Sequence, residues 1–401
     1  MARLRSLWHA MFSTGRLAER HRCSGYNSAY ESDARSVEEY VAEWRAKVAA
    51  ARTDLGDAKA EAIVDGNSPF LLKPDTPGRP RRGILLAHGL SDSAFLVRDI
   101  SAFFQQRGFY VYAMLLPGHG TRPGDLLEIR WQDWLQAHQH ALDLLSAEVD
   151  EVFLLGFSAG ASLSLYQALH HRAIRALFLF APALRVRRLA ALACPLAWLG
   201  RFWERFKWLD VQPDDDPYKY ESLSNRSICE AYRLVKVLRR VCAAKQLHTP
   251  VFVVASDNDV TVDSGAVVDW FRRLRCAPRR MLLYSARQVP VPEGVRVVSA
   301  HLPEQGIKSF AHTALLQSPD NPHYGARGCY RFCTHYYVFD RRKYARCKAG
   351  DQDCLGEMFE ETLDCQVVRR LTWNPFYADM LAEMDAFLQQ LPSAASGARQ
   401  E

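Results

Sequence analysis

Short, almost uninterrupted apolar runs alternate with longer segments of helical periodicity through the middle of the chain. Five such runs have the length of buried strands, at residues 83–87, 109–114, 152–155, 176–180 and 251–254. Runs at 281–284 and 295–299 follow, and we take 295–299 as the last strand. Strands covered on both faces lose the apolar–polar alternation of half-exposed strands. The pattern therefore predicts an α/β domain with a mostly parallel central sheet and helices on both faces.

The segments that flank this alternation are expected to be additions to the sheet domain. Residues 1–75 form a polar extension of mixed charge, in which apolar side chains at helical spacing indicate one docking helix: Val37, Tyr40, Val41, Trp44, Val48 and Leu55. A Pro-, Gly- and Arg-rich linker at 74–82 then leads into the core. Residues 317–372 read as a Cys- and Tyr-rich insertion, and 373–401 as a closing core helix at 377–391 with a tail.

Residues 184–245 interrupt the alternation and divide the sheet domain into residues 76–183 and 246–316. Their apolar positions keep helical spacing, which predicts a helical cap inserted into the sheet domain. The first half of the cap interleaves Arg and Lys with large aromatic residues, which are Trp198, Phe202, Trp203, Phe206 and Trp208. An apolar substrate or a membrane surface would suit this pattern. An ordinary lid, by contrast, would bury the same aromatic side chains against the core.

Charge and the first residues of the chain narrow the set of partners. The net charge is only +6, from 51 Lys and Arg against 45 Asp and Glu, and it is dispersed, so no nucleic-acid partner is expected. The first residues hold no apolar run long enough for a signal peptide or a membrane span. For the chain as given, this predicts a cytoplasmic protein.

The ten cysteines complicate that expectation. Five of them fall within the insertion: Cys329, Cys333, Cys347, Cys354 and Cys365. Disulfides among them would imply an oxidising compartment and an exported protein. No pair has the CxxC spacing of a zinc site, and reduced cysteines packed as small apolar side chains fit the pattern as well as disulfides do. The sequence therefore leaves localisation open.

A Gly-x-Ser-x-Gly segment, residues 156–160, directly follows the apolar run at 152–155 and opens a helical segment. This strand–turn–helix context is that of a nucleophile elbow, which presents its serine above the carboxyl edge of a sheet. Ser158 is therefore the candidate nucleophile. The backbone N–H groups of Ala159 and Leu90 are the candidate oxyanion-hole donors, Leu90 because it follows His88-Gly89 after the first core strand. We expect a structural role for His88.

The acid of a serine triad is expected after a strand that follows the cap. Three aspartates lie just beyond the apolar run at 251–254. Asp259 fits the strand-end position best and is the candidate acid. Asp257 could instead cap the turn, and Asp263 is well placed to cap the next helix.

The base is expected after the last strand. His312 follows residues 295–299 and opens an apolar segment, so it is the candidate base. His301 lies close to the end of that strand, and His323 lies in a loop rich in Pro, Asp and Asn. The resulting order of the triad is Ser158, Asp259, His312.

Together with Leu116–Thr121 (LPGHGT) and Trp131–Trp134 (WQDW), these motifs resemble the monoacylglycerol lipase and lysophospholipase-like branch of the α/β hydrolases, which is related to the serine aminopeptidases. The resemblance runs from Gly83 to Leu316, excluding most of the cap, and resumes in the closing helix. It implies the α/β-hydrolase fold with an inserted helical cap. It also implies that the loop carrying His119 borders the site without a catalytic role. The run at 281–284, the extension and the insertion have no counterpart in the simple lipases.

The sequence thus predicts a serine hydrolase that cleaves carboxylic esters, with acylglycerol- or lysophospholipid-type small molecules as substrates. A metal or an organic cofactor is not expected, because the triad performs acyl transfer through a covalent acyl-enzyme. Trp203 and Phe206 of the cap are the candidate substrate-binding residues. A serine peptidase or amidase with the same triad and a catalytically silent binding protein are the alternatives. Acyl length, head group and oligomeric state are not determined by the sequence.

Overall fold

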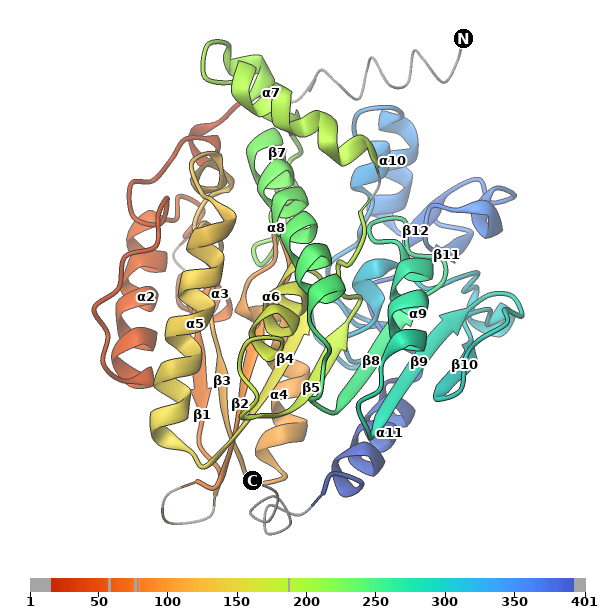
Figure 1. The fold of residues 1–401 in the computed structure, drawn as a ribbon. Helices are drawn as coiled ribbons and strands as arrows, with labels where there is room; N and C mark the ends of the chain where they lie inside the picture. The colour runs from red at the N-terminus through yellow and green to blue at the C-terminus, as the bar shows by residue number, and fades with distance from the viewer. Residues whose placement is uncertain (1–15, 57–58, 76–77, 79, 187, 393–401) are drawn as a thin grey trace.

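A central eight-stranded sheet organises the protein, as shown by a computed structural model that describes residues 16–56, 59–75, 78, 80–186 and 188–392 (Figure 1). The strand order is β1-β3-β2-β4-β5-β8-β9-β10. Only β1 is antiparallel to its neighbour, and the other pairs are parallel. The strands are β1 (Phe70–Leu72), β2 (Arg82–Ala87), β3 (Phe109–Ala113), β4 (Glu151–Phe157), β5 (Ile174–Phe180), β8 (Val251–Ser256), β9 (Arg279–Ser285) and β10 (Val295–Ser299).

All seven apolar runs of the sequence lie in strands of this sheet, so the predicted α/β architecture is confirmed. The short edge strand β1 was not predicted. Its three residues carry too little pattern to be distinguished from the preceding loop. Parts of the predicted linker at 74–82 and of the tail after residue 392 lie outside the described residues.

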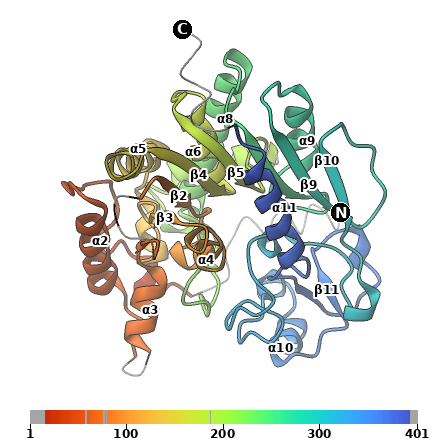
Figure 2. The ribbon, with the colours of Figure 1, turned by 90° about the horizontal axis from the view of Figure 1, so that it is seen from below.

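Helices cover both faces of the sheet, and each face has its own apolar core (Figure 2). On one face α5, α6, α8 and α9 pack against the sheet, and on the other α4 and α11 do so. The helices are α2 (Val37–Ala51), α3 (Ala60–Asn67), α4 (Arg98–Gln105), α5 (Trp131–Glu148), α6 (Ala159–Ala168), α7 (Ala193–Leu199), α8 (Asn225–Ala244), α9 (Ser264–Arg273), α10 (Arg341–Ala349) and α11 (Tyr377–Gln389). Within the described ranges, no helix is long and apolar enough to cross a bilayer.

The docking helix expected in the N-terminal extension is α2. Ser36 caps its first turn by accepting a hydrogen bond from the N–H of Glu39 at 3.1 Å. Tyr40 and Trp44 are fully buried, and the Tyr40 hydroxyl donates to the Leu115 carbonyl at 3.0 Å. Leu55 lies beyond the end of the helix but still packs against the core. The extension is thus integrated with the sheet domain through α2.

The segment predicted as a helical cap contains α7 and α8, joined by the disulfide Cys194–Cys229. It also contains a small antiparallel pair, β6 (Trp208–Asp210) and β7 (Leu223–Ser224), which the helical periodicity did not predict. In Figure 1, α8 lies above the carboxyl ends of the central strands and α7 crosses farther out. The cap therefore covers the edge of the sheet from which the nucleophile elbow projects.

The C-terminal insertion is built around α10 and a parallel pair, β11 (Cys354–Gly356) and β12 (Val368–Arg370). Two disulfides, Cys333–Cys347 and Cys354–Cys365, join four of its five cysteines, and Cys329 keeps a free thiol. The sequence left open disulfides, a zinc site or reduced cysteines, and the structure has disulfides. Among the described residues no cluster of His, Cys, Asp or Glu is arranged to hold a metal ion.

Short 3₁₀ helices complete the secondary structure and connect the larger elements. They are η1 (Glu19–His21), η2 (Ala94–Val97), η3 (Pro123–Leu127), η4 (Arg188–Leu192), η5 (Glu204–Phe206), η6 (Pro303–Gln305), η7 (His312–Ala314), η8 (Thr334–Tyr336) and η9 (Glu360–Thr362).

Candidate active site

Ser158 lies in the tight turn between β4 and α6, with φ 53° and ψ −112°. A positive φ is costly for a residue with a side chain and persists only where the surroundings enforce it. The flanking glycines are needed for space. A Cβ on Gly156 would lie 2.4 Å from the N atom of Ala161, and one on Gly160 would lie 2.3 Å from the carbonyl oxygen of Ala87. The Gly-x-Ser-x-Gly segment therefore adopts the strained elbow that the sequence predicted.

The structure brings Asp259 and His312 together. Asp259 Oδ2 lies 2.5 Å from Nδ1 of His312, although the two residues are 53 positions apart. The other carboxylate oxygen of Asp259 accepts hydrogen bonds from the N–H groups of Thr261 at 2.7 Å and Val262 at 3.0 Å. The carboxylate is thus fixed by backbone donors while it holds the imidazole through Nδ1. This leaves Nε2 of His312 available for another partner.

The competing residues are placed elsewhere. Asp257 forms an ion pair with Arg287 at 3.2 Å, and Asp263 caps α9 by accepting from the N–H of Ala266 at 2.9 Å. His301 is exposed, and His323 is paired with Asp216 at 2.9 Å.

A cavity of about 270 Å³ contains the predicted residues Ser158, Ala159, Leu90 and His312 in its wall. In the described part of the chain, Ser158 Oγ has no hydrogen-bond partner, and catalytic hydrogen bonds often tighten only when substrate binds. Ala159 is the first residue of α6, so its N–H has no acceptor within the helix. Leu90, the other residue expected to contribute an oxyanion donor, lines the same cavity as Ser158 and Ala159.

His88 and His119 hold the loops of the site and are kept neutral by burial. His88 accepts from the N–H of Leu116 at 3.0 Å and donates from Nδ1 to the Gly89 carbonyl at 2.9 Å. Burial lowers the pKa of His88 to about 4 and that of His119 to about 3. His88 thus ties the loop that carries Leu90 to the next loop of the site, in agreement with the structural role expected for it.

Trp203 and Phe206 do not line this cavity, so the sequence assignment of these two residues to substrate binding is corrected here. The Trp203 side chain is 56% exposed. The aromatic residues of this segment pack edge to face on one another, with ring centroids 5.5 Å apart for Trp198 and Phe202 and 6.2 Å apart for Trp203 and Phe206. The sequence correctly marked the positions of this segment as apolar, but a pattern of apolar positions does not show whether their side chains face the cavity or the solvent.

The lid over Ser158 comes instead from α8 and from the segment around β6 and β7. Ala231, Leu234 and Val235 of α8 lie in the cavity wall at the i, i+3, i+4 spacing of one helix face. That spacing was visible in the sequence, but the preceding aromatics gave a stronger apolar signal. Polar side chains from residues 210–221 also line the cavity, including Asp210, Lys219 and Glu221.

The C-terminal insertion contributes residues to the cavity that sequence reasoning missed, namely Phe332, Thr334 and Arg370. They lie 174 to 212 positions from Ser158 in a segment without a recognisable motif, so no local signal could have found them. Next to them, the buried Glu221 carboxyl accepts from the Tyr330 hydroxyl at 2.6 Å, and burial raises the pKa of Glu221 to about 7. The cavity is therefore closed by three parts of the chain: the sheet edge, the cap and the insertion.

Comparison with known proteins covers the cap and most of the sheet domain, from β2 to β9. Residues 78–286 match the family model described as serine aminopeptidase, S33. A thermostable monoacylglycerol lipase from Bacillus sp. (strain H-257) is 27% identical over 208 residues, which are 51% of this chain and 78% of that protein. The match ends before His312 and the insertion.

Solved structures with a similar fold include two lipolytic enzymes. One, described as LipS and LipT, two metagenome-derived lipolytic enzymes, has 20% identity and a TM-score of 0.47 over 54% of this chain and 87% of its own. The monoacylglycerol lipase of Paleococcus ferrophilus has 18% identity and a TM-score of 0.43 over 54% of this chain and 88% of its own.

Proposed function

The chain belongs to the serine aminopeptidase, S33, family of α/β hydrolases, and we propose that it hydrolyses carboxylic esters with Ser158 as nucleophile, His312 as base and Asp259 as supporting acid. The observation that carries this proposal is the hydrogen bond between Asp259 and His312, whose ring borders the same cavity as Ser158. Nucleophile, base and acid follow one another along the chain in the order that this fold uses.

In the proposed mechanism His312 takes the proton of Ser158 as the serine oxygen attacks the ester carbonyl carbon. Asp259 holds the proton on Nδ1 and stabilises the imidazolium that forms. The N–H groups of Leu90 and Ala159 stabilise the negative charge on the carbonyl oxygen. His312 then gives its proton to the departing alcohol, and water hydrolyses the acyl-enzyme by the same steps.

The cavity lining supports an ester with one apolar and one polar part. Apolar side chains of α8 and of the loop after β5 line it, together with polar side chains from residues 210–221 and from the insertion. A volume of about 270 Å³ is slightly below the usual range of about 300–1,000 Å³ for small-molecule sites. We therefore propose short- and medium-chain acylglycerol-type esters as substrates, in keeping with the name of the Bacillus relative.

A peptidase that binds a substrate amine is the second candidate, because the carboxyl groups of Asp210 and Glu221 line the cavity. Burial raises the pKa of Glu221 to about 7, so part of its charge is lost at neutral pH and its attraction for a cation is weakened. Comparing nitrophenyl esters with aminoacyl nitroanilides discriminates the two functions.

Replacement of the nucleophile tests the proposal directly. Ser158→Ala is expected to lower kcat for nitrophenyl butyrate by about four orders of magnitude or more and to abolish labelling by a fluorophosphonate probe. Ser162→Ala is the matched control, since Ser162 lies on α6 in the same cavity wall and its hydroxyl donates to the Ala183 carbonyl at 2.9 Å. Activity of Ser158→Ala within tenfold of the unmodified protein would exclude the mechanism. Absence of labelling in the unmodified protein would favour a silent binding protein.

A further inference from the structure

The segment that ends at His312 is hydrogen-bonded to the C-terminal insertion. The N–H of Leu355 in β11 donates to the Gly306 carbonyl at 2.8 Å, and the N–H of Lys308 donates back to the Leu355 carbonyl at 2.8 Å. Residues 306–308 thus lie along the free edge of β11, whose other edge pairs with β12. The insertion is therefore fixed by backbone hydrogen bonds to residues 306–308, just before the proposed base His312.

The residue that follows β11 reaches His312 itself. Glu357 is fully buried, and its Oε2 accepts from the backbone N–H of His312 at 3.3 Å and from Arg370 Nη2 at 2.7 Å. Its Oε1 accepts from the N–H of Met358 at 2.9 Å, and its own N–H donates to Ser309 Oγ at 3.0 Å. A buried carboxylate is costly unless it is paired and hydrogen-bonded, and here each oxygen has a partner.

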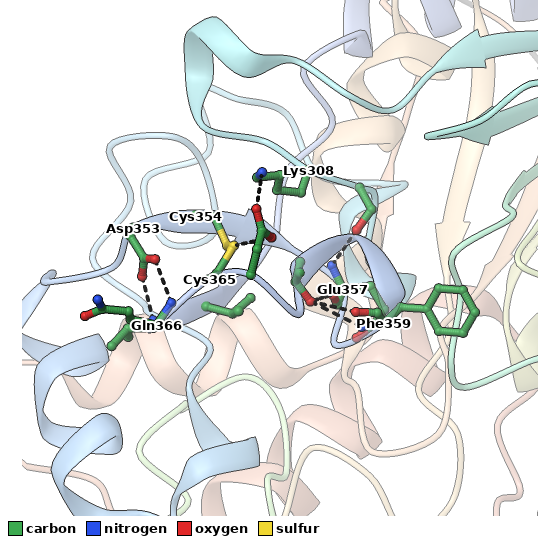
Figure 3. The surroundings of a disulfide bond; sticks show 12 residues. Lys308, Asp353, Cys354, Glu357, Phe359, Cys365 and Gln366 are labelled. Atoms are coloured by element: carbon green, nitrogen blue, oxygen red, sulfur yellow. Dashed lines mark hydrogen bonds and ion pairs between the residues drawn. A yellow bond between two sulfur atoms is a disulfide. The ribbon is translucent and has the colours of Figure 1, made fainter.

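A closed loop holds Glu357 in this position (Figure 3). The disulfide Cys354–Cys365 joins the two ends of the loop, and Asp353 accepts from the N–H groups of Gln366 at 2.7 Å and Val367 at 2.5 Å beside it. Lys308 forms an ion pair with Asp364 at 3.0 Å across the same loop. Within the loop, the Thr362 hydroxyl donates to the Glu357 carbonyl at 2.9 Å. The loop is therefore restrained at its neck, in its interior and against the segment before His312.

We propose that Glu357 is a positioning residue for His312. This proposal rests on the proposed function, in which His312 is the base. Asp259 fixes the ring of His312 through Nδ1, and Glu357 of the insertion fixes the backbone N–H of His312. A base that must reach the serine proton within hydrogen-bond distance needs both restraints, since a displacement of about 1 Å can cost about 100-fold in rate. The insertion is in this sense part of the catalytic apparatus, although the family match ends before it.

Two conservative substitutions of Glu357 separate the effect of its side-chain length, which reaches His312, from the effect of its negative charge, which pairs with Arg370. Glu357→Gln keeps the length of the side chain and an acceptor oxygen for the N–H of His312. Glu357→Asp keeps the negative charge for Arg370 but withdraws it from His312 by one methylene. If Glu357 positions His312, Glu357→Asp lowers kcat for nitrophenyl butyrate by about 10- to 100-fold with KM within about twofold, whereas Glu357→Gln keeps kcat within about threefold.

Tyr336→Phe is the control for a purely structural role, because it removes the hydrogen bond that the Tyr336 hydroxyl accepts from the N–H of Val368 at 2.9 Å inside the insertion, without touching Glu357 or His312. It is expected to lower Tm and leave kcat within about threefold. The proposal is overturned if Glu357→Asp keeps kcat, if Glu357→Gln loses as much kcat as Glu357→Asp, or if kcat follows Tm across the three variants. An unchanged kcat in Ser158→Ala, by contrast, would overturn the proposed function, while the hydrogen bond between Glu357 and the N–H of His312 would remain.

Discussion

At the scale of single residues, the site depends on conformations that are costly in isolation. Ser158 has a positive φ, which costs about 1–3 kcal/mol for such a residue. The cost is borne by the surrounding structure, where β4, α6 and the Ala87 backbone approach so closely that only glycine fits at positions 156 and 160. This steric requirement is local, which is why five consecutive residues were enough to predict it.

Three aspartates compete in the sequence after β8, and their contacts give each a different role. Because only Asp259 is bonded to His312, Asp259→Asn is expected to lower kcat for nitrophenyl butyrate by about 10⁴-fold through loss of the correct imidazole tautomer. Asp257→Asn should stay within about threefold, since Asp257 contacts Arg287 and Ser285. Steady-state kinetics of the two purified variants checks this. A larger loss for Asp257→Asn would mean that the acid lies two residues earlier than we propose.

At the scale of secondary-structure elements, the two helices of the cap differ in what they contact. α8 presents Leu234 and Val235 to the cavity, and both are buried. The segment after α7 presents Phe202 and Trp203 outward, 64% and 56% exposed. We propose that the first surface binds the acyl group and that the second makes peripheral contact with a membrane.

Chain-length discrimination should therefore depend on α8. Leu234→Ala is expected to lower kcat/KM for nitrophenyl octanoate about tenfold more than for nitrophenyl acetate, since each buried methylene contributes about 0.8 kcal/mol. The double change Trp203→Ala with Phe206→Ala should leave that ratio unchanged and lower activity only on esters presented in anionic vesicles. If the Trp203→Ala, Phe206→Ala variant changes the octanoate-to-acetate ratio of kcat/KM for dissolved esters, Trp203 and Phe206 contact the acyl group after all. An equal loss on octanoate and acetate in Leu234→Ala would place the acyl chain elsewhere.

At the scale of the whole molecule, close packing of helices on both sheet faces buries several histidines. His138 of α5 is fully buried, and its Nε2 lies 3.3 Å from the Ser164 hydroxyl of α6. Burial lowers the pKa of His138 to about 3, from an ordinary 6.5. As the pH falls below 6.5, the unfolded chain takes up this proton first. Stability that is present above pH 6.5 is therefore lost toward pH 3, by about 1.4 kcal/mol per pH unit.

Removal of this histidine should flatten the acid limb of the stability curve. Between pH 7 and pH 5, His138→Gln is expected to lose about 2 kcal/mol less free energy of unfolding than the unmodified protein. Urea unfolding at the two pH values measures this difference. His301→Gln is the control, because His301 is exposed. The same pH sensitivity in His138→Gln as in the unmodified protein would show that folding does not lower the pKa of His138.

The sequence by itself determined the features that depend on neighbouring residues. Apolar runs predicted seven of the eight strands of the central sheet, most clearly the inner ones, because a strand buried on both faces must be apolar throughout. The elbow at Ser158 and the cap of α9 at Asp263 were visible because turns and helix ends impose requirements within a few positions. The expected order of Ser158, Asp259 and His312 followed from the order in which triads of this fold occur along the chain.

Only the tertiary structure decided what meets across long distances in the chain. The cavity wall combines α8 with Phe332 and Arg370 of the insertion, and Glu357 reaches His312 across 45 positions. The aromatics of the cap misled the sequence analysis because an apolar pattern predicts that a face is apolar and not what covers it. The pairing of the cysteines was equally undetermined, since disulfides form according to distance in the folded chain. Contacts of this kind arise from the packing of whole elements, and no short stretch of sequence encodes them.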